Sequence, residues 1–366
     1  MAPGRPVGHP SPSRRPGRLD SGGVSPTTHE PILIVGAGPI GLACAISARR
    51  RGLDPLVADA GAVADSIVRY PVGMVFFTTP ERLEIGGHPL VCAGAKPTRE
   101  EALKYYRGVT RAEGLRVRPY TKLVAATRRD DRVRCELQTR LGPVILTCDR
   151  LVLATGYFDH PNPLDVPGET LPHVSHYFDE AHRSFGQDVV VIGGRNSAVE
   201  AALQLFRAGA RVTLVYRGAE FPKSVKYWLR PDIQNRIKAG EIAARLGATV
   251  DEITARDVGI RRADGSRERL PAERVYALTG FHPDLELFRG IGIAYDPASG
   301  RPVLDPETLQ TSVPGVHLAG SVTAGNQISE IFIENGRFDG EKIFGDAASR
   351  VAAQAGYASI ERPPGE

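Results

Sequence analysis

Two glycine-rich segments, far apart in the chain, have the spacing of turns that hold the pyrophosphate of a dinucleotide. The first reads Gly-Ala-Gly-Pro-Ile-Gly from Gly36 to Gly41, and the second reads Gly-Gly-Arg-Asn-Ser-Ala from Gly193 to Ala198. Glycine permits a tight turn and a close approach of the backbone to phosphate, and the helix that follows directs free amides at the same charge. Two such sites in one chain indicate that electrons pass from one bound nucleotide to another, which is flavoenzyme chemistry.

The segments around the first turn supply the other parts of a dinucleotide site. An apolar run at 32–35 predicts a buried strand, and an alanine-rich run at 42–50 predicts a helix. Asp59 ends the next strand, within the interval of about 20 residues expected for an acid that binds the ribose. Its carboxylate would accept hydrogen bonds from ribose hydroxyls and repel a 2′-phosphate. A tight turn in an ordinary strand–helix–strand unit is the alternative.

The second turn differs at the positions that select the cofactor. Strands are predicted at 188–192 and 211–216, on either side of a helix. Arg195 takes the place of the middle glycine, and Arg217 follows the second strand, where the ribose-binding acid would stand. Arginine pairs strongly with phosphate, so this turn favours NADPH over NADH. The alternative is a solvated basic face, which nearby lysines would extend.

Composition and charge describe an ordinary protein with enough chain for two domains. It has 366 residues, of which 42% are hydrophobic and 24% charged. Residues 1–29 are rich in proline, glycine, serine and arginine, cannot bury a core and are predicted to be disordered. This tail carries four arginines and one aspartate, so it supplies three of the four net positive charges, and the nearly neutral remainder does not support nucleic-acid binding. No apolar run approaches the roughly 18 residues of a membrane span, so a cytoplasmic protein is predicted.

The four cysteines are Cys44, Cys92, Cys135 and Cys148, and no two form a Cys-x-x-Cys pair. A dithiol relay needs two thiols that can join, so none is predicted. Cys44 lies on the first helix, one turn past the glycines, and is the candidate nearest in sequence for thiol chemistry beside a flavin. A packed helix residue is the alternative for Cys44. The spacing of histidine and cysteine predicts no metal site.

The order of the predicted elements indicates an α/β fold with two Rossmann-like, three-layer dinucleotide-binding domains, the second inserted in the first. The first domain would comprise 30–160 and 283–350, and the second 186–282. A proline-rich linker at 159–172 would pass between them. Further expectations are an antiparallel meander within 122–148, a buried strand at 151–154, a long helix at 329–350 and a flexible C-terminus at 351–366.

Several segments outside the generic glycine turns resemble a known family. They are Lys96 to Arg99, Ala102 to Tyr106, Gly156 to Asp159, Asn196 to Glu200, Lys226 to Trp228, Pro231-Asp232 and Glu330 to Gly336. The order of elements resembles the two-dinucleotide-binding flavoproteins, of which thioredoxin reductases are compact members. Taken together, the segments are similar to the bacillithiol-disulfide reductase family over about residues 30–350.

This resemblance implies one bound FAD, NADPH as reductant, and reduction of the disulfide of a low-molecular-weight thiol, bacillithiol. It places the FAD site at Gly36, Gly38, Pro39, Ile40, Gly41, Asp59, Gly156, Gly320 and Ser321. It places the NADPH site at Gly193, Gly194, Arg195, Asn196, Ser197 and Arg217. Two positions depart from the pattern: Ile40 stands where members often have a cysteine, and Ser321 where thioredoxin reductases have an aspartate. Because isoleucine does no thiol chemistry, the electron acceptor stays open.

Three other functions stay open at this point. Residues 167–178 resemble the loop between the nucleotide sites of flavin monooxygenases, although the usual Phe-x-Gly before His173 is missing. A reductase that passes electrons to a ferredoxin or a flavin protein needs no thiol and suits Ile40. A nucleotide-sensing binding protein without turnover is the non-enzymatic alternative. A homo-oligomer is compatible with each of these.

Overall fold

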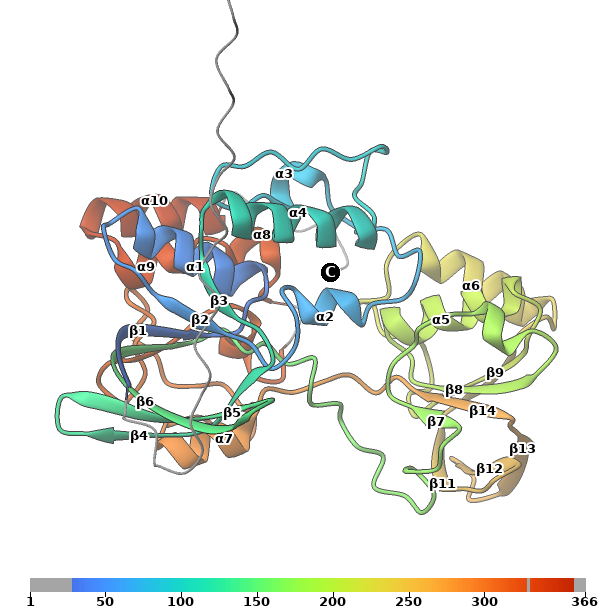
Figure 1. The fold of residues 1–366 in the computed structure, drawn as a ribbon. Helices are drawn as coiled ribbons and strands as arrows, with labels where there is room; N and C mark the ends of the chain where they lie inside the picture. Colours follow the sequence, from blue (N-terminus) through green and yellow to red (C-terminus); the bar gives the residue numbers. More distant parts are fainter. Residues whose placement is uncertain (1–27, 328–329, 359–366) are drawn as a thin grey trace, which may run out of the picture.

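The two glycine turns lie in two separate sheets, side by side in the molecule and joined by two chain crossings (Figure 1). The computed structural model describes residues 28–327 and 330–358. The first turn follows β1 (Thr28–Val35) and the second follows β8 (Asp188–Ile192). After the second sheet is complete, β15 (Val316–Leu318) pairs with a strand of the first sheet. The predicted α/β fold, with one Rossmann-like domain inserted in the other, is therefore confirmed.

The first sheet has seven strands in the order β3-β2-β1-β6-β5-β4, with β15 also paired to β6. The remaining bounds are β2 Leu56–Ala58, β3 Arg116–Arg118, β4 Thr121–Arg129, β5 Arg132–Thr139 and β6 Gly142–Leu153. β4, β5 and the start of β6 form the predicted antiparallel meander. β1, β2, β3 and β15 run parallel to their neighbours, so their carboxyl ends, where the glycine turn begins, meet at one edge.

The sequence predicted separate strands for the end of the meander and for 151–154, but the structure has one long strand, β6. Residues 142–148 pair antiparallel with β5, and residues 151–153 pair parallel with β15 on the same edge. The polar residues between these two paired segments had indicated the end of one strand and the start of another. Arg150 instead extends from the strand, where its guanidinium lies 5.3 Å from the Phe344 ring centroid and donates to the Ile343 carbonyl.

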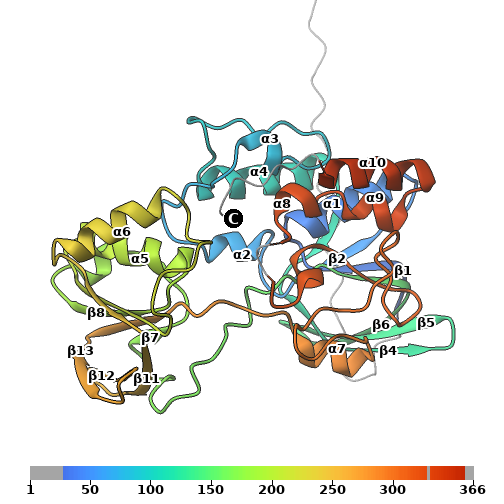
Figure 2. The same cartoon turned by 180° about the vertical axis from the view of Figure 1, so that it is seen from behind.

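The second sheet is parallel, in the order β10-β9-β8-β14-β7. Its other strands are β7 Val174–Ser175, β9 Arg211–Tyr216, β10 Ala243–Leu246 and β14 Arg274–Ala277. A small antiparallel sheet is attached to it, formed by β11 Ala248–Ile253, β12 Asp257–Arg262 and β13 Arg267–Pro271. Figure 2 shows this small sheet below the parallel sheet, at the end of the second domain.

Each domain has three layers with a core on both faces of its sheet. In the first domain α1 (Pro39–Arg49) and α4 (Arg99–Ala112) cover one face, and α7 (Leu285–Ile291) covers the other. In the second domain α5 (Asn196–Arg207) and α6 (Leu229–Lys238) cover one face, and the small antiparallel sheet covers the other. The shorter helices α2 (Asp65–Val68) and α3 (Pro80–Leu83) belong to the segment between β2 and α4. Two 3₁₀ turns occur at His182–Ser184 and Gly320–Ala324.

The predicted long helix at 329–350 is wrong. The described part of this segment forms α8 (Ile333–Gly336), α9 (Asp339–Phe344) and the start of α10 (Ala347–Ala358). Glycine at 336 and 345 breaks the helix, and Gly345 takes an extended conformation after α9. Ser329, where the helix was expected to begin, lies outside the described residues.

Both ends of the chain differ from expectation where they are described. Thr28 and His29, counted as the end of the disordered tail, begin β1 and pair with Leu146 and Thr147. Residues 351–358, expected to be flexible, continue α10. Residues 1–27 and 359–366, on which the rest of those predictions falls, lie outside the described residues. Across the described ranges no helix has the length and apolar character to cross a membrane.

Candidate functional site

The backbone of the first turn leaves no room for side chains at two of its glycines. Gly36 has φ +110°, and a Cβ there would lie 2.3 Å from the Ala154 carbonyl oxygen. A Cβ on Gly41 would lie 1.9 Å from the Gly36 carbonyl oxygen. These contacts bring the start of α1 against the ends of β1 and β6. Both residues are therefore glycine for reasons of packing and backbone conformation.

Gly38 has the opposite environment, because a Cβ there would meet no atom within 4 Å. It precedes α1, whose first turn holds no acidic residue, and no side chain caps the helix. Pro39, at the first helical position, has no amide hydrogen, so the free amides begin at Ile40. The backbone here suits a phosphate at the helix N-terminus, and these residues fit the pyrophosphate of FAD.

Asp59 is held at the end of β2 by two backbone amides. Its Oδ2 accepts from the Ala37 N–H at 2.6 Å, and its Oδ1 accepts from the Gly61 N–H at 2.7 Å. Burial raises the pKa of this carboxyl, and the two amide donors act in the opposite direction. A carboxylate oxygen accepts more than one hydrogen bond, so both oxygens keep capacity for ribose hydroxyls.

The structure brings the three flavin segments expected from the resemblance to one edge of the first sheet. A Cβ on Gly156 would lie 3.6 Å from the Ser321 Oγ, so the turns after β6 and β15 are adjacent. The Gly320 N–H donates to the Asp339 Oδ2 at 2.6 Å. A Cβ on Gly320 would lie 2.7 Å from the Ile40 Cδ1, which links this turn to the first.

Ile40 is a packing residue in this arrangement. Its Cδ1 also faces Gly336, where an added Cβ would lie 2.6 Å away. The side chain thus fills the space between two glycines from the C-terminal part of the chain. The position where the family pattern often has a thiol is occupied here by a hydrocarbon in close contact.

Gly193 in the second turn repeats the role of Gly36, whereas Gly194 lies one position before Arg195, the counterpart of Gly38. Gly193 has φ +142°, and a Cβ there would lie 2.5 Å from the Leu278 carbonyl oxygen. A Cβ on Gly194 would lie 2.4 Å from the Tyr216 ring. That ring stacks on Phe221 with an interplanar angle of 6°. Gly194 is therefore glycine because an aromatic ring from the end of β9 lies over it.

The arginines of the second turn are exposed cations. Within the described residues, neither the Arg195 nor the Arg217 guanidinium makes a hydrogen bond or an ion pair, whereas Arg211, on the strand before Arg217, pairs with Asp188 at 2.6 Å. Ser197 is also exposed. Two exposed guanidinium groups without carboxylate partners fit the phosphates of NADPH.

The Asn196 side chain has a structural role that the sequence did not indicate. Its Oδ1 accepts from the Lys226 N–H at 2.9 Å, and its Nδ2 donates to the Ser224 carbonyl at 3.0 Å. The side chain thus fixes the loop before α6 to the start of α5. Asn196 and Lys226 are 30 positions apart in the sequence, so no local pattern indicates this contact.

The environments of the four cysteines do not resemble a thiol relay. Cys44 is fully buried beneath α9, where Gly340 packs on its Cα, and burial together with Asp339 raises the pKa of its thiol well above the usual range. Cys135 and Cys148 are buried on the opposite face of the sheet, with their Sγ atoms 3.9 Å apart. Cys92 donates to the Gly94 carbonyl, and its thiol pKa is also raised. A raised pKa keeps a thiol protonated and unreactive at neutral pH.

An aromatic cluster beside the chain crossings was not found from the sequence. The Phe158 ring lies 4.7 Å from Phe281 and 5.3 Å from Tyr70, between centroids, and Tyr177 lies 5.2 Å from it. Pro161 and Phe281, one from each crossing, form an antiparallel bridge. The two crossings are thus paired strands at the border of the domains, where few residues would have to change for the domains to rotate.

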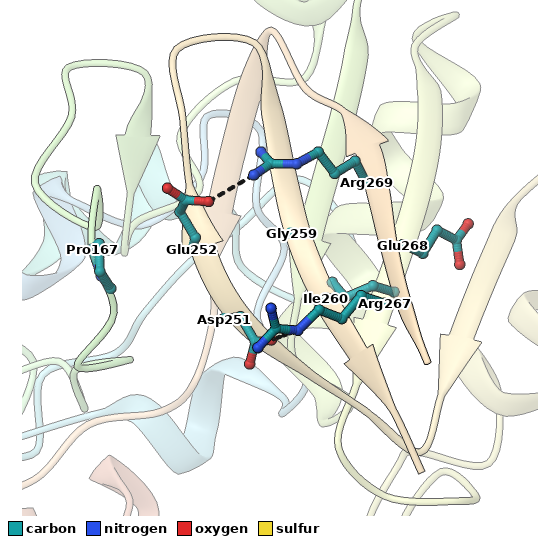
Figure 3. Close-up of a pocket in the computed structure, with 8 residues that line it drawn as sticks. All are labelled: Pro167, Asp251, Glu252, Gly259, Ile260, Arg267, Glu268 and Arg269. Atoms are coloured by element: carbon teal, nitrogen blue, oxygen red, sulfur yellow. Dashed lines mark hydrogen bonds and ion pairs between the residues drawn. The ribbon is translucent and has the colours of Figure 1, made fainter. Parts of the chain in front are cut away.

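The pocket in Figure 3 lies elsewhere, on the small antiparallel sheet of the second domain. Its charged side chains satisfy one another, as in the ion pair between Arg269 and Glu252 at 2.9 Å. It is remote from both glycine turns. Within the described residues, no cluster of three or more histidine, cysteine or acidic side chains could hold a metal ion.

Comparison with known proteins connects these two sites with an activity. The sequence pattern of pyridine nucleotide-disulphide oxidoreductases matches residues 33–320. The chain is 41% identical to the bacilliredoxin reductase of Bacillus subtilis over 321 residues, which cover 88% of this chain and 98% of that protein. The chain belongs to the bacillithiol-disulfide reductase family.

Solved structures agree with this family. A bacillithiol disulfide reductase from Bacillus cereus superimposes with a TM-score of 0.85 at 39% identity, covering 91% of this chain and all of that one. A thioredoxin reductase from T. acidophilum, at 21% identity and a TM-score of 0.68, shares the fold. The family member described here is an FAD-containing, NADPH-dependent disulfide reductase, as the resemblance predicted. The monooxygenase and ferredoxin-reductase alternatives are not favoured.

Proposed function

We propose that this protein uses NADPH to reduce the disulfide of a small thiol, bacillithiol. The observation that carries the proposal is the 41% identity to a bacilliredoxin reductase over 98% of that protein. The open backbone at Gly38 and the exposed guanidinium groups of Arg195 and Arg217 support it. A cytoplasmic location is part of the proposal, because a protein with four free cysteines and a thiol product suits a reducing compartment.

The first domain binds FAD in this proposal. The backbone at Gly38 and the amides of the first turn of α1 hold the pyrophosphate, and Asp59 accepts from the ribose. Ser321, whose hydroxyl lies beside Gly156, would donate a hydrogen bond to FAD. FAD supplies a ring that takes a hydride from NADPH and passes two electrons onward.

The second domain binds NADPH. The amides at the start of α5 and the guanidinium of Arg195 meet the pyrophosphate, and Arg217 meets the 2′-phosphate. Asn196 orders the loop before α6 and does not itself need to contact the cofactor. The residues that would hold NADPH all belong to this one domain, so its orientation would set the position of the nicotinamide.

No described cysteine is placed to relay electrons, so the proposal includes none. The disulfide would then be reduced without a protein thiol: two electrons and one proton from NADPH, with one proton from solvent, would break its S–S bond and give two free thiols. Ile40 lines the turn as hydrocarbon and excludes water from the carboxyl edge of the sheet. Cys44 as a catalytic thiol stays a prediction that its burial does not support.

An anaerobic absorbance experiment on the purified holoenzyme tests this function. NADPH should bleach the flavin, and bacillithiol disulfide should then restore the oxidised spectrum with two thiols formed per NADPH. Glutathione disulfide, an oxidised ferredoxin and oxygen serve as parallel acceptors. Reoxidation by ferredoxin or oxygen alone would contradict the proposed substrate, and an absence of bleaching would contradict the reductase activity itself.

A further inference from the structure

Four side chains form a contact between the two domains that neither nucleotide site requires. We name this contact the aromatic clasp; its members are Phe77 and Lys96 of the first domain and Lys226 and Trp228 of the second, with Tyr227 packed on Trp228. The Lys226 Nζ lies 2.9 Å from the centroid of the Phe77 ring. The rings of Phe77 and Trp228 have centroids 6.1 Å apart. The Lys96 Nζ lies 5.6 Å from the centroid of the Trp228 ring.

The second-domain half of the clasp is tied directly to the NADPH turn. Asn196, the first residue of α5, accepts from the backbone N–H of Lys226 and donates to the Ser224 carbonyl. The Lys226 carbonyl in turn accepts from the Leu229 N–H at 2.9 Å, where α6 begins. A single side chain thus joins the start of the NADPH-binding helix to the clasp.

The first-domain half is tied to the FAD turn. The Phe76 N–H donates to the Pro97 carbonyl at 2.9 Å, which holds Phe77 and Lys96 side by side. The Arg99 Nε donates to the Ile67 carbonyl of α2 at 3.1 Å. The residue before α2, Ala64, donates its N–H to the Ala37 carbonyl within the first glycine turn. The clasp therefore connects the two turns through short chains of contacts.

The contact is small and partly open to solvent. Tyr227 is 72% exposed and Trp228 is 40% exposed, whereas Lys226 is only 7% exposed. A buried ammonium group needs compensation, and the negative faces of two aromatic rings supply part of it. Such a contact is too small to lock two domains permanently, but it favours one orientation over others.

We propose that the aromatic clasp is a positioning element, which holds the NADPH-binding domain in the orientation for hydride transfer and is tightened by nucleotide binding through Asn196. The inference rests on the proposed function in taking the two turns as the FAD and NADPH sites. The clasp residues do not touch the reacting atoms. Their effect is on how often the nicotinamide reaches the flavin.

The first test measures flavin reduction by saturating NADPH in anaerobic stopped-flow experiments on the holoenzyme. Phe77→Ala should slow bleaching about 10-fold, the loss expected for one cation–aromatic contact of moderate strength. Phe77→Tyr keeps the ring face and should restore the rate. FAD content, Tm and the NADPH concentration for half-maximal rate should change little. Leu141→Ala is the matched control, because Leu141 is an exposed apolar residue of the first domain remote from the clasp.

A second test uses the spectroscopic signal of the clasp itself. Trp228 is the only tryptophan of the chain, so its fluorescence reports this contact without a label. Saturating NADP⁺ should protect Trp228 from acrylamide quenching in the unaltered protein. The protection should be lost in Phe77→Ala and in Asn196→Ala.

The outcomes separate the clasp from the proposed function. If the unaltered protein is bleached by NADPH and Phe77→Ala is bleached at the same rate, the clasp proposal is overturned and the reductase activity stands. Equal quenching with and without saturating NADP⁺ would overturn the tightening through Asn196. If NADPH does not bleach the unaltered protein, the proposed function fails first.

Discussion

The first glycine of each turn has the same role, whereas the next glycine, Gly38 in one turn and Gly194 in the other, differs in position and in surroundings. Gly36 and Gly193 both take a positive φ and press on a carbonyl from a neighbouring strand. Gly38 faces open space beside the start of a helix, whereas Gly194 lies under the Tyr216 ring. The second glycine of each turn therefore serves a different purpose: Gly38 leaves space beside the start of a helix, and Gly194 accommodates an aromatic side chain.

The turns also differ in how their charges are held. Asp59, at the turn proposed for FAD, is half-buried and fixed by two amides, which makes it a rigid acceptor. The side chains of Arg195 and Arg217, at the turn proposed for NADPH, are exposed and unpaired within the described residues. A cofactor that stays bound suits a rigid, buried site. A cofactor that enters and leaves in each turnover suits an exposed one.

The largest effect should come from the two glycines that the turns share. Gly36→Ala combines a strained φ with a backbone clash, so it should cost on the order of 3 kcal/mol of stability and release FAD. Gly193→Ala should cost a similar amount in its own domain, keep FAD and abolish bleaching by NADPH. Thermal unfolding, flavin content and absorbance measure the pair. Loss of FAD from Gly193→Ala would show that the domains are not separate folding units.

The next largest effect should distinguish Gly38 from Gly194, the second glycine of each turn. Gly38→Ala meets no atom, so its Tm should change little while FAD binding weakens. Gly194→Ala displaces the Tyr216 ring and should cost about 2 kcal/mol. In a double-mutant cycle with Tyr216→Ala, about 1 kcal/mol or more of that loss should disappear. Strictly additive losses would mean that Gly194 is not glycine on account of this ring.

Cofactor preference should depend on one exposed arginine. Arg217→Ala removes a charge-assisted contact worth about 1.5–3 kcal/mol, so the KM for NADPH should rise roughly 10- to 100-fold while that for NADH stays the same. Arg211→Ala is the control, because Arg211 lies on the same strand but pairs with Asp188. Equal losses with NADPH and NADH in Arg217→Ala would place the 2′-phosphate elsewhere.

The smallest effect should be a pH dependence of the free energy of unfolding, caused by two buried groups of the first domain. Burial raises the pKa of Asp339, which holds the Gly320 N–H, from 3.8 to about 7. The folded state then keeps a proton that the unfolded chain releases, so the free energy of unfolding should fall as pH rises from about 4 to 7. Burial lowers the pKa of His317, on β15, from 6.5 to about 4, which should give the opposite slope between those values.

The two slopes should largely cancel in the unaltered protein below pH 6.5. Asp339→Asn should leave a rise of at most about 1.4 kcal/mol per pH unit, and His317→Gln should leave a fall of that size. Urea unfolding at pH 4.5, 5.5 and 6.5 measures both. Parallel curves for the two variants would mean that neither group titrates as its burial indicates.

Much of the fold followed from local patterns, and the errors occurred where partners are distant. The glycine turns, the meander of β4 to β6 and the return of β15 to the first sheet were predicted, because each depends on short apolar runs and turn residues. The long C-terminal helix was wrong, because α8 ends at Gly336 and α9 ends before Gly345, where the backbone is extended. Gly336 and Gly340 pack against Ile40 and Cys44 of α1, contacts that no local pattern indicates.

The candidate site shows the same division. The family and both cofactors were predicted from segments such as Gly156 to Asp159 and Lys226 to Trp228. The roles of Asn196 and Tyr216 were not, since each depends on a residue that the sheet order brings close. Cys44 was a candidate only for its place in the sequence, and its burial under α9 became visible in three dimensions.

The sequence by itself determined that the chain uses two nucleotides, FAD and NADPH, and that Ile40 rather than a thiol stands in the first turn; it also predicted which turn holds each cofactor. Those properties depend on residue type and on spacing within one strand–turn–helix unit, where local geometry is nearly invariant. Only the tertiary structure decided which atoms face each glycine, that Ile40 fills the space between two other glycines, and that Phe77 meets Lys226 across the domains. These contacts join residues far apart in the chain, and their distances are set by sheet order and domain packing rather than by any local pattern.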